Sequence, residues 1–207
     1  IMRRRQRQMC IRDRSYNHEK YLDFGLELLK KIITTSFDTE YFPKSRNIRQ
    51  LVFYLKYFII LREFLKESSN EIPGYLDEII FHLGKGYNFV WGSVKQSLLF
   101  NGNHNSNLED FDVYLDYQKY SFKSEKRDLG GYGILKNKNV ILGMDIGTAP
   151  ESKFSENYQS GPLSFEAIYK GRKIICNSGY YQNRKKNLNL ISRSTAAHST
   201  LILNNNS

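Results

Sequence analysis

The stretch GGYGILKNKNVILGMDI, residues 130–146, decides the fold class of this chain. Two short apolar runs, Tyr132–Leu135 and Val140–Ile146, flank the turn residues Lys136–Asn139, and this pattern predicts a β-hairpin. The glycine pair Gly130-Gly131 marks the point where the hairpin begins. It does not form a phosphate-binding loop, because no helix and no lysine of that motif follow it.

Further strands are predicted on the C-terminal side of the hairpin. Leu163–Tyr169 and Lys173–Cys176 flank the turn Lys170-Gly171-Arg172, and Thr200–Leu203 begins another strand. The pattern predicts a β-rich region over residues 121–207. We expect its sheet to be incomplete, because no partner strand follows the last predicted one.

The N-terminal side of the hairpin has helical periodicity instead. One helix is predicted from Glu19 to about Thr35. A second is predicted from Asn47 to Glu67, with Ser45 as its N-cap. Thirteen of the eighteen residues 48–65 are apolar, a pattern typical of an inner helix covered on most of its circumference.

Two more helices complete this half of the chain. Pro73 is expected in the first turn of a helix over Tyr75–Lys95, interrupted near Gly84–Gly86. A short helix is predicted over Leu108–Tyr117. Helices and strands in separate blocks imply an α+β, two-domain chain, with a helical domain over residues 15–120. Antiparallel helix pairs of this kind build an α/α toroid or a helical bundle.

Half of the net charge of +10 lies in residues 1–14, which hold six arginines and one aspartate. We interpret this segment as non-native and exclude it from the functional argument. The alternative is a basic arm that binds nucleic acid. Only Cys10 and Cys176 are present, which excludes a disulfide framework. The mean hydropathy of -0.55 excludes a membrane bundle, and we expect no membrane span.

Three C-terminal stretches carry a resemblance to a known family. They are Leu163-Ser164-Phe165-Glu166, then Gly171-Arg172-Lys173 running on to Asn177-Ser178-Gly179, and then Arg193-Ser194-Thr195-Ala196-Ala197-His198-Ser199-Thr200. Their order and spacing resemble the β-sandwich domain of the heparinase II/III-like polysaccharide lyases. The segment Phe42-Pro43-Lys44-Ser45-Arg46-Asn47, followed by a long apolar helix, is similar to the end of that family's α/α toroid.

The resemblance implies a fold and a reaction. We expect a partial α/α toroid followed by a partial antiparallel β-sandwich, and thus a fragment of a longer protein. The implied reaction is β-elimination on a uronic-acid-containing polysaccharide, of the heparin, heparan or alginate kind. A donor or cation must neutralise the sugar carboxylate before its C5 proton becomes acidic. A tyrosine or histidine then removes that proton, and another protonates the departing oxygen.

Five residues are the candidates for these roles, and Arg46 is a candidate for both. His198, Tyr54 and Arg46 are expected to act in catalysis, and Arg46, Asn47 and Asn177 to bind the substrate. Three of them have a plainer interpretation: His198 as a structural histidine, Tyr54 as a core residue, and Arg46 as the salt-bridge partner of Glu40. His82 and His104 are expected to be structural or solvated.

The sequence departs from the family pattern at several positions. Gln50 stands where the family has a tyrosine, and Tyr54 follows one helical turn later. Asn157 and Gln159 replace the histidines of an H-x-H motif, and Asn177 replaces an aspartate that holds structural zinc together with the residue matched by His198. Because amides are poor zinc ligands, we predict no zinc and no other cofactor.

Two functions therefore stay open. The first is a lyase acting on an acidic polysaccharide in the periplasm or cell envelope, a location implied by the family's polymeric substrates alone. The second is a catalytically degenerate glycan-binding or envelope protein of the same fold. An acidic polysaccharide is the expected partner in both, and nucleic acid is expected in neither.

Overall fold

The computed structural model describes residues 18–92, 94–182 and 186–202. The chain divides into two compact units, residues 1–36 and residues 37–207, and each is described by itself. The first unit contributes helix α2 (His18–Ser36), which confirms the helix predicted from Glu19. The basic segment 1–14 lies outside the described residues. The expected domain boundary near residue 120 lies within the second unit.

The second unit begins with a short loop and helix α3 (Ile48–Glu67). Asn47 caps this helix: its Oδ1 accepts hydrogen bonds from the backbone N–H of Arg49 at 2.9 Å and of Gln50 at 3.3 Å. The prediction that Ser45 is the N-cap was wrong. Asn47 is the cap because its extended backbone directly precedes the first helical turn. The Ser45 hydroxyl instead donates a hydrogen bond to Gln50 Oε1 at 2.5 Å.

Helix α4 (Gly74–Tyr87) packs against α3 and continues without a break into a π-helical turn, η1 (Asn88–Gly92). The predicted interruption at Gly84–Gly86 is therefore wrong. These glycines serve close packing instead. A Cβ at Gly84 would collide with the ring of Phe122, and one at Gly86 would lie 2.8 Å from Leu51. Helix α5 (Glu109–Tyr117) confirms the predicted short helix.

Helix α3 is less enclosed than its composition predicts. Leu51, Leu55 and Ile59 are fully buried. On another face Phe53 is 54% exposed and Phe64 is 62% exposed, so the expectation of a helix covered on most of its circumference does not hold in this structure. Among the described residues, no helix is long and apolar enough to cross a bilayer.

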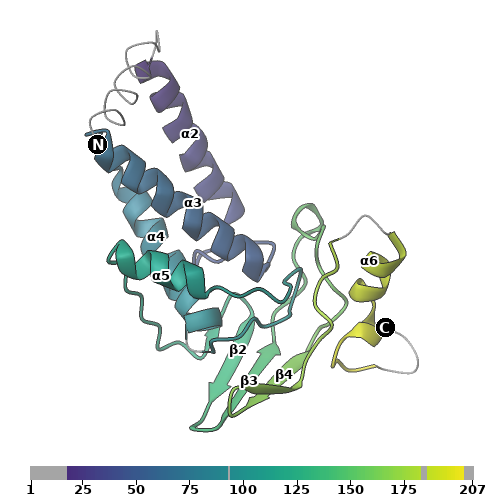
Figure 1. Cartoon of the computed structure of the whole chain (residues 1–207). Coiled ribbons are helices and arrows are strands. Elements are labelled where there is room, and N and C mark those ends of the chain that lie inside the picture. Colours follow the sequence, from purple (N-terminus) through teal and green to yellow (C-terminus); the bar gives the residue numbers. More distant parts are fainter. Residues whose placement is uncertain (1–17, 93, 183–185, 203–207) are drawn as a thin grey trace. The chain divides into compact units, whose positions relative to one another are not determined.

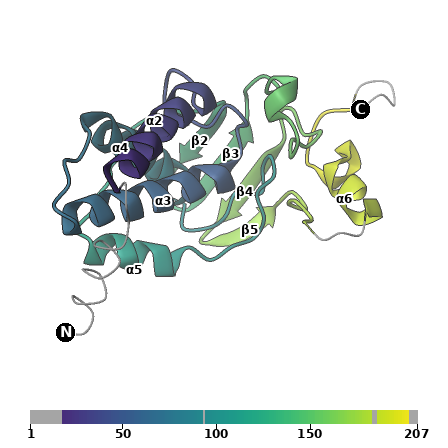
Figure 2. The ribbon, with the colours of Figure 1, turned by 90° about the horizontal axis from the view of Figure 1, so that it is seen from above.

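The strands form one antiparallel sheet in the order β1-β2-β3-β4-β5, each paired with its neighbour in sequence. Figures 1 and 2 show β2, β3 and β4 side by side. In the central pair, Tyr132 lies opposite Asp145 and Lys136 opposite Ile141, which confirms the predicted hairpin. The strands are β1 (Asp128–Leu129), β2 (Tyr132–Lys136), β3 (Val140–Asp145), β4 (Phe165–Tyr169) and β5 (Arg172–Ile175).

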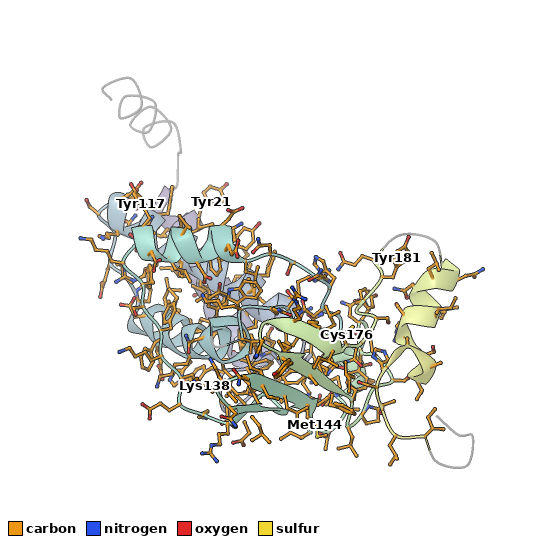
Figure 3. All side chains as sticks on the ribbon, turned by 60° about the horizontal axis from the view of Figure 1, so that its bottom comes forward. Tyr21, Tyr117, Lys138, Met144, Cys176 and Tyr181 are labelled. Carbon is orange, nitrogen blue, oxygen red and sulfur yellow. The ribbon has the colours of Figure 1, made fainter. Side chains whose placement is uncertain are left out.

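The chain beyond β5 differs most from the prediction. Residues 200–202 form no strand, and helix α6 (Lys186–Arg193) was not predicted. Figure 3 shows Cys176 at the end of the sheet and Tyr181 farther along the path toward α6. A short 3-10 turn, η3 (Thr195–Ala197), follows α6, and another, η2 (Ser152–Phe154), lies in the loop between β3 and β4. Here the backbone is held by loop and side-chain hydrogen bonds, which have no sequence period.

Candidate functional site

Arg46 ties the loop before α3 to the sheet. Its backbone has a φ of 56°, and its guanidinium lies 5.0 Å from the centroid of the Tyr132 ring. The acceptors of its hydrogen bonds are Gly130 O (3.2 Å), Thr148 O (2.8 Å), Gly131 O (2.8 Å) and the carboxylate of Asp145. All three guanidinium nitrogens are thus engaged within the protein. The alternative prediction, a salt bridge between Arg46 and Glu40, is wrong, because Glu40 pairs with Lys126 Nζ at 2.5 Å.

Asp145 is the centre of a buried polar network that sequence reasoning missed. It is 1% exposed, and its second carboxylate oxygen accepts from Asn101 Nδ2 at 2.8 Å. Asn101 Nδ2 also bonds the Tyr132 hydroxyl at 2.8 Å, and that hydroxyl donates to the Arg46 carbonyl. The only sequence signal was an aspartate closing an apolar strand. The network fixes the loop that carries Asn101 against the start of α3.

The loop after Asn101 brings two predicted motif positions together. Gly102 has a φ of 80°, and a Cβ there would overlap Asn47 Nδ2 and lie 3.1 Å from Asn157 Cβ. Asn47 and Asn157 come from segments more than one hundred residues apart, yet both border this glycine. Asn47 is 1% exposed, and its Nδ2 has no hydrogen-bond partner within the described structure. One of the expected substrate-binding residues therefore carries an unused donor.

Gln159 is a hub of this region. Its side chain is 1% exposed. The Oε1 atom accepts from Gly102 N–H at 3.0 Å, and Nε2 donates to Gly179 O at 3.1 Å and to Ser192 O at 2.7 Å. One buried amide therefore joins the loop at 102, the segment after β5 and the end of α6. A histidine at this position has two ring nitrogens and could not make all three bonds.

His198 shares an acceptor with Gln159. Its Nε2 lies 3.1 Å from Ser192 O, and because a carbonyl oxygen only accepts, Nε2 carries the proton. If the ring is neutral, Nδ1 then keeps a lone pair.

Asn177 lies beside this segment. Its Oδ1 accepts from the backbone N–H of Ser199 at 2.9 Å, while its buried Nδ2 has no partner in the described residues. The Asn177 side chain thus contacts Ser199, the residue that follows His198 in the sequence.

The tyrosines of the region lie in different surroundings. Tyr54 packs edge-on against Phe37, with ring centroids 4.9 Å apart, and against Phe58 at 5.7 Å. In the described structure no hydrogen bond or ring contact joins it to His198. Tyr158, which sequence reasoning passed over, lies near Arg46 and Asp145. Burial first, and then the charge of Asp145, raise the pKa of the Tyr158 phenol.

The residues at the positions implied for zinc do not fit that metal. Gln159 and Asn177 are amides, and the side-chain oxygen of each already accepts a hydrogen bond from the backbone. His198 Nε2 faces a carbonyl oxygen. In the part of the chain that the structure describes, no three His, Cys, Asp or Glu side chains are grouped so that they could hold a metal ion.

The burial of His198 predicts a pH-dependent stability. Burial lowers the pKa of its imidazole below the usual range, with the bond to Ser192 opposing this in part. Below about pH 6.5 the unfolded chain therefore takes up a proton that the folded chain resists, and stability is lost as pH falls. The pKa values of His82 and His104 are lowered as well, chiefly by burial.

We expect His198→Gln to lose less stability than the parent chain between about pH 7.5 and about pH 5.5. Urea unfolding at both pH values measures this difference. His82 and His104 remain in both proteins, so their shared contribution cancels in the comparison. An unchanged pH dependence in His198→Gln would mean that His198 is not held neutral by the fold.

Helices pack beside an open antiparallel sheet, and polar side chains from both halves converge on the loop at Gly102. Residues 122–207 match the family model described as heparinase II/III-like, C-terminal. The match lies in the C-terminal part of the chain, whose sequence is similar to that of the heparinase II/III-like family.

Solved structures of similar fold extend the likeness to the helices. A heparinase III with methylated lysines has a TM-score of 0.75 at 12% identity, covering 93% of this chain and 34% of that one. A second heparinase III gives 0.73 at 15% identity, with 92% and 36% covered. A heparan sulfate lyase from Pedobacter heparinus gives 0.71 at 15% identity, with 92% and 34% covered. No curated protein matches the sequence significantly. The chain spans about a third of the length of these solved structures.

Proposed function

We propose that the protein containing this chain is a lyase that cleaves a uronic-acid-containing polysaccharide by β-elimination. The observation that carries the proposal is the convergence at Gly102 of Asn47 and Asn157, two positions of the toroid and sandwich motifs, within a fold shared with heparinase III structures. The buried Nδ2 of Asn47 is an unused donor there. A donor of this kind is suited to neutralise a sugar carboxylate.

The proton transfers need a base and an acid. His198 is proposed as the base, because its neutral ring would keep the Nδ1 lone pair while Nε2 bonds Ser192 O. Tyr54 was expected to act in catalysis, but it packs among phenylalanine rings. Tyr158 is the better candidate for the acid, because its phenol lies near the charged groups of Arg46 and Asp145 and is protonated at neutral pH. Arg46 would act by holding this region together rather than by touching the substrate.

No zinc is needed in this proposal, and the location in the periplasm or cell envelope remains part of it. Replacing Gln159 with histidine and Asn177 with aspartate would supply two good zinc ligands beside His198. We expect this double variant, unlike the parent chain, to gain thermal stability when zinc is added and to lose the gain with a chelator. A zinc-dependent gain in the parent chain, lost in His198→Ala, would contradict the metal-free proposal.

A second candidate, a non-catalytic glycan-binding protein, is favoured by one observation. Gln50 and Gln159, at positions where the family has ionisable side chains, are amides bonded within the protein, and amides do not exchange protons near neutral pH. The complete gene product, incubated with heparin, heparan sulfate, alginate and hyaluronan, distinguishes the candidates. A lyase yields 4,5-unsaturated uronate, followed by its ultraviolet absorbance. Binding without that product would favour the second candidate.

A further inference from the structure

A cavity of about 210 Å³ lies beside the first half of α3, bounded on its other sides by η1 and the loop 97–108. Its wall is mainly apolar, and Phe53, which is 54% exposed, forms part of it. Trp91 lines it too, but its indole N–H already has an acceptor within the protein, since Nε1 donates to the Asp112 carboxylate at 3.0 Å. The cavity thus offers a ring face and aliphatic groups to a ligand. The aliphatic residues of the wall are Ile48, Val52, Val90, Leu98 and Leu108.

The charges around this cavity all have one sign. Arg49 and Lys56 line it from positions about two turns apart on α3, and none of its lining residues is acidic. Within the described residues, neither side chain makes a hydrogen bond or an ion pair. This contrasts with Arg46 and Arg62, which bind Asp145 and Asp77. An apolar wall bordered by unpaired cations is complementary to an anion with an apolar face.

A third group points to a ligand. His104 also lines the cavity, and its Nδ1 is buried with no partner in the described structure. Arg49 lines the same cavity, and burial, followed by the charge of Arg49, lowers the pKa of His104. A buried polar atom without a partner is unfavourable. A ligand hydroxyl or carboxylate that reaches Nδ1 would remove this cost.

We propose that this cavity is a subsite for one uronate unit of the polysaccharide. The C–H face of the sugar packs against Phe53 and the aliphatic wall. Its carboxylate binds Arg49 and Lys56, and a hydroxyl reaches His104. A uronate matches the site because it joins one carboxylate to a ring with an apolar face, which a fully polar anion such as phosphate does not. This subsite rests on the proposed function, but Arg49 and His104 take no part in the proton transfers assigned to His198 and Tyr158.

The test uses the complete gene product and three probes: methyl glucuronide, the uncharged methyl glucoside and benzoate. Binding is measured by saturation-transfer NMR and calorimetry. We expect Arg49→Gln to weaken glucuronide binding about tenfold or more, since a charge-assisted hydrogen bond is lost. Lys56→Gln should act in the same direction. Lys123→Gln is the matched control: Lys123 is exposed and does not line the cavity, so its loss should leave binding unchanged.

The outcomes separate the subsite from the reaction. Equal glucuronide binding by the parent protein and Arg49→Gln, with both folded by circular dichroism, overturns the subsite even if unsaturated product is released from a glycan. Arg49-dependent glucuronide binding without any unsaturated product supports the subsite and counts against the lyase. Arg49-dependent binding of benzoate but not of glucuronide also overturns the proposal, because the cavity would then take aromatic acids.

Discussion

Replacing Arg46 with methionine is expected to lower the free energy of unfolding by about 3–5 kcal/mol, because it leaves a buried carboxylate without its partner. Asp145 is 1% exposed, and after the substitution only the Asn101 amide and the backbone N–H of Gly147 would still bond it. The backbone carbonyls of Gly130, Gly131 and Thr148 would lose a donor as well. Urea unfolding of the chain measures the change.

Two further variants make the Arg46 result specific. Arg127→Met, which removes an exposed arginine, should change stability by no more than about 0.5 kcal/mol. Adding Asp145→Asn to Arg46→Met should restore part of the loss, since the unpaired charge is then removed. A loss below about 1 kcal/mol in Arg46→Met, or no recovery in the double variant, would refute the view that this ion pair joins the helical segment to the sheet.

Gln159→Leu is expected to cost roughly 3 kcal/mol or more, because three buried backbone groups lose their partner at once. These are the N–H of Gly102 and the carbonyls of Gly179 and Ser192. Leucine has nearly the same size, so the loss is one of hydrogen bonding and not of volume. Hydrogen exchange adds a local reading: the Gly102 amide should exchange faster in the variant than in the parent chain.

The control for Gln159 is Gln182→Leu, which changes an exposed glutamine in the same C-terminal region. It should leave both the stability and the exchange of Gly102 as they are in the parent chain. If Gln159→Leu behaved like this control, Gln159 would not be the tie between the loop at 102, the segment after β5 and the end of α6.

The regular elements of the fold were predictable because their sequences have a period. The alternation in residues 130–146 gave the hairpin, and helical spacing gave α3 and α5 nearly to the residue. The prediction of secondary structure failed where the residue type favours one conformation and tertiary packing favours another. Gly84 and Gly86 have the residue type of a helix break, yet α4 continues through them because Phe122 and Leu51 need the space that a side chain would fill.

The candidate site was predictable only where a motif marked it. Asn47, Asn177 and His198 were singled out from short stretches of sequence, and the structure shows what each one contacts. The partners that hold them could not be read in the same way. Arg46 and Asp145 are 99 residues apart in sequence, and Gln159 was considered only as a lost metal ligand. Such pairings depend on the tertiary fold, and no local pattern encodes them.

The measurement that bears most directly on the proposed lyase is the rate of unsaturated uronate formation by the complete gene product, compared with His198→Ala. On the acidic glycan that it cleaves best, we expect the variant to be slower by a factor of about 10²–10⁴, the usual contribution of a positioned base. Calorimetric binding of that glycan should be retained, and the variant should keep its fold. Product formation at the parent rate by His198→Ala, or no product from any acidic glycan by the parent protein, would contradict the account.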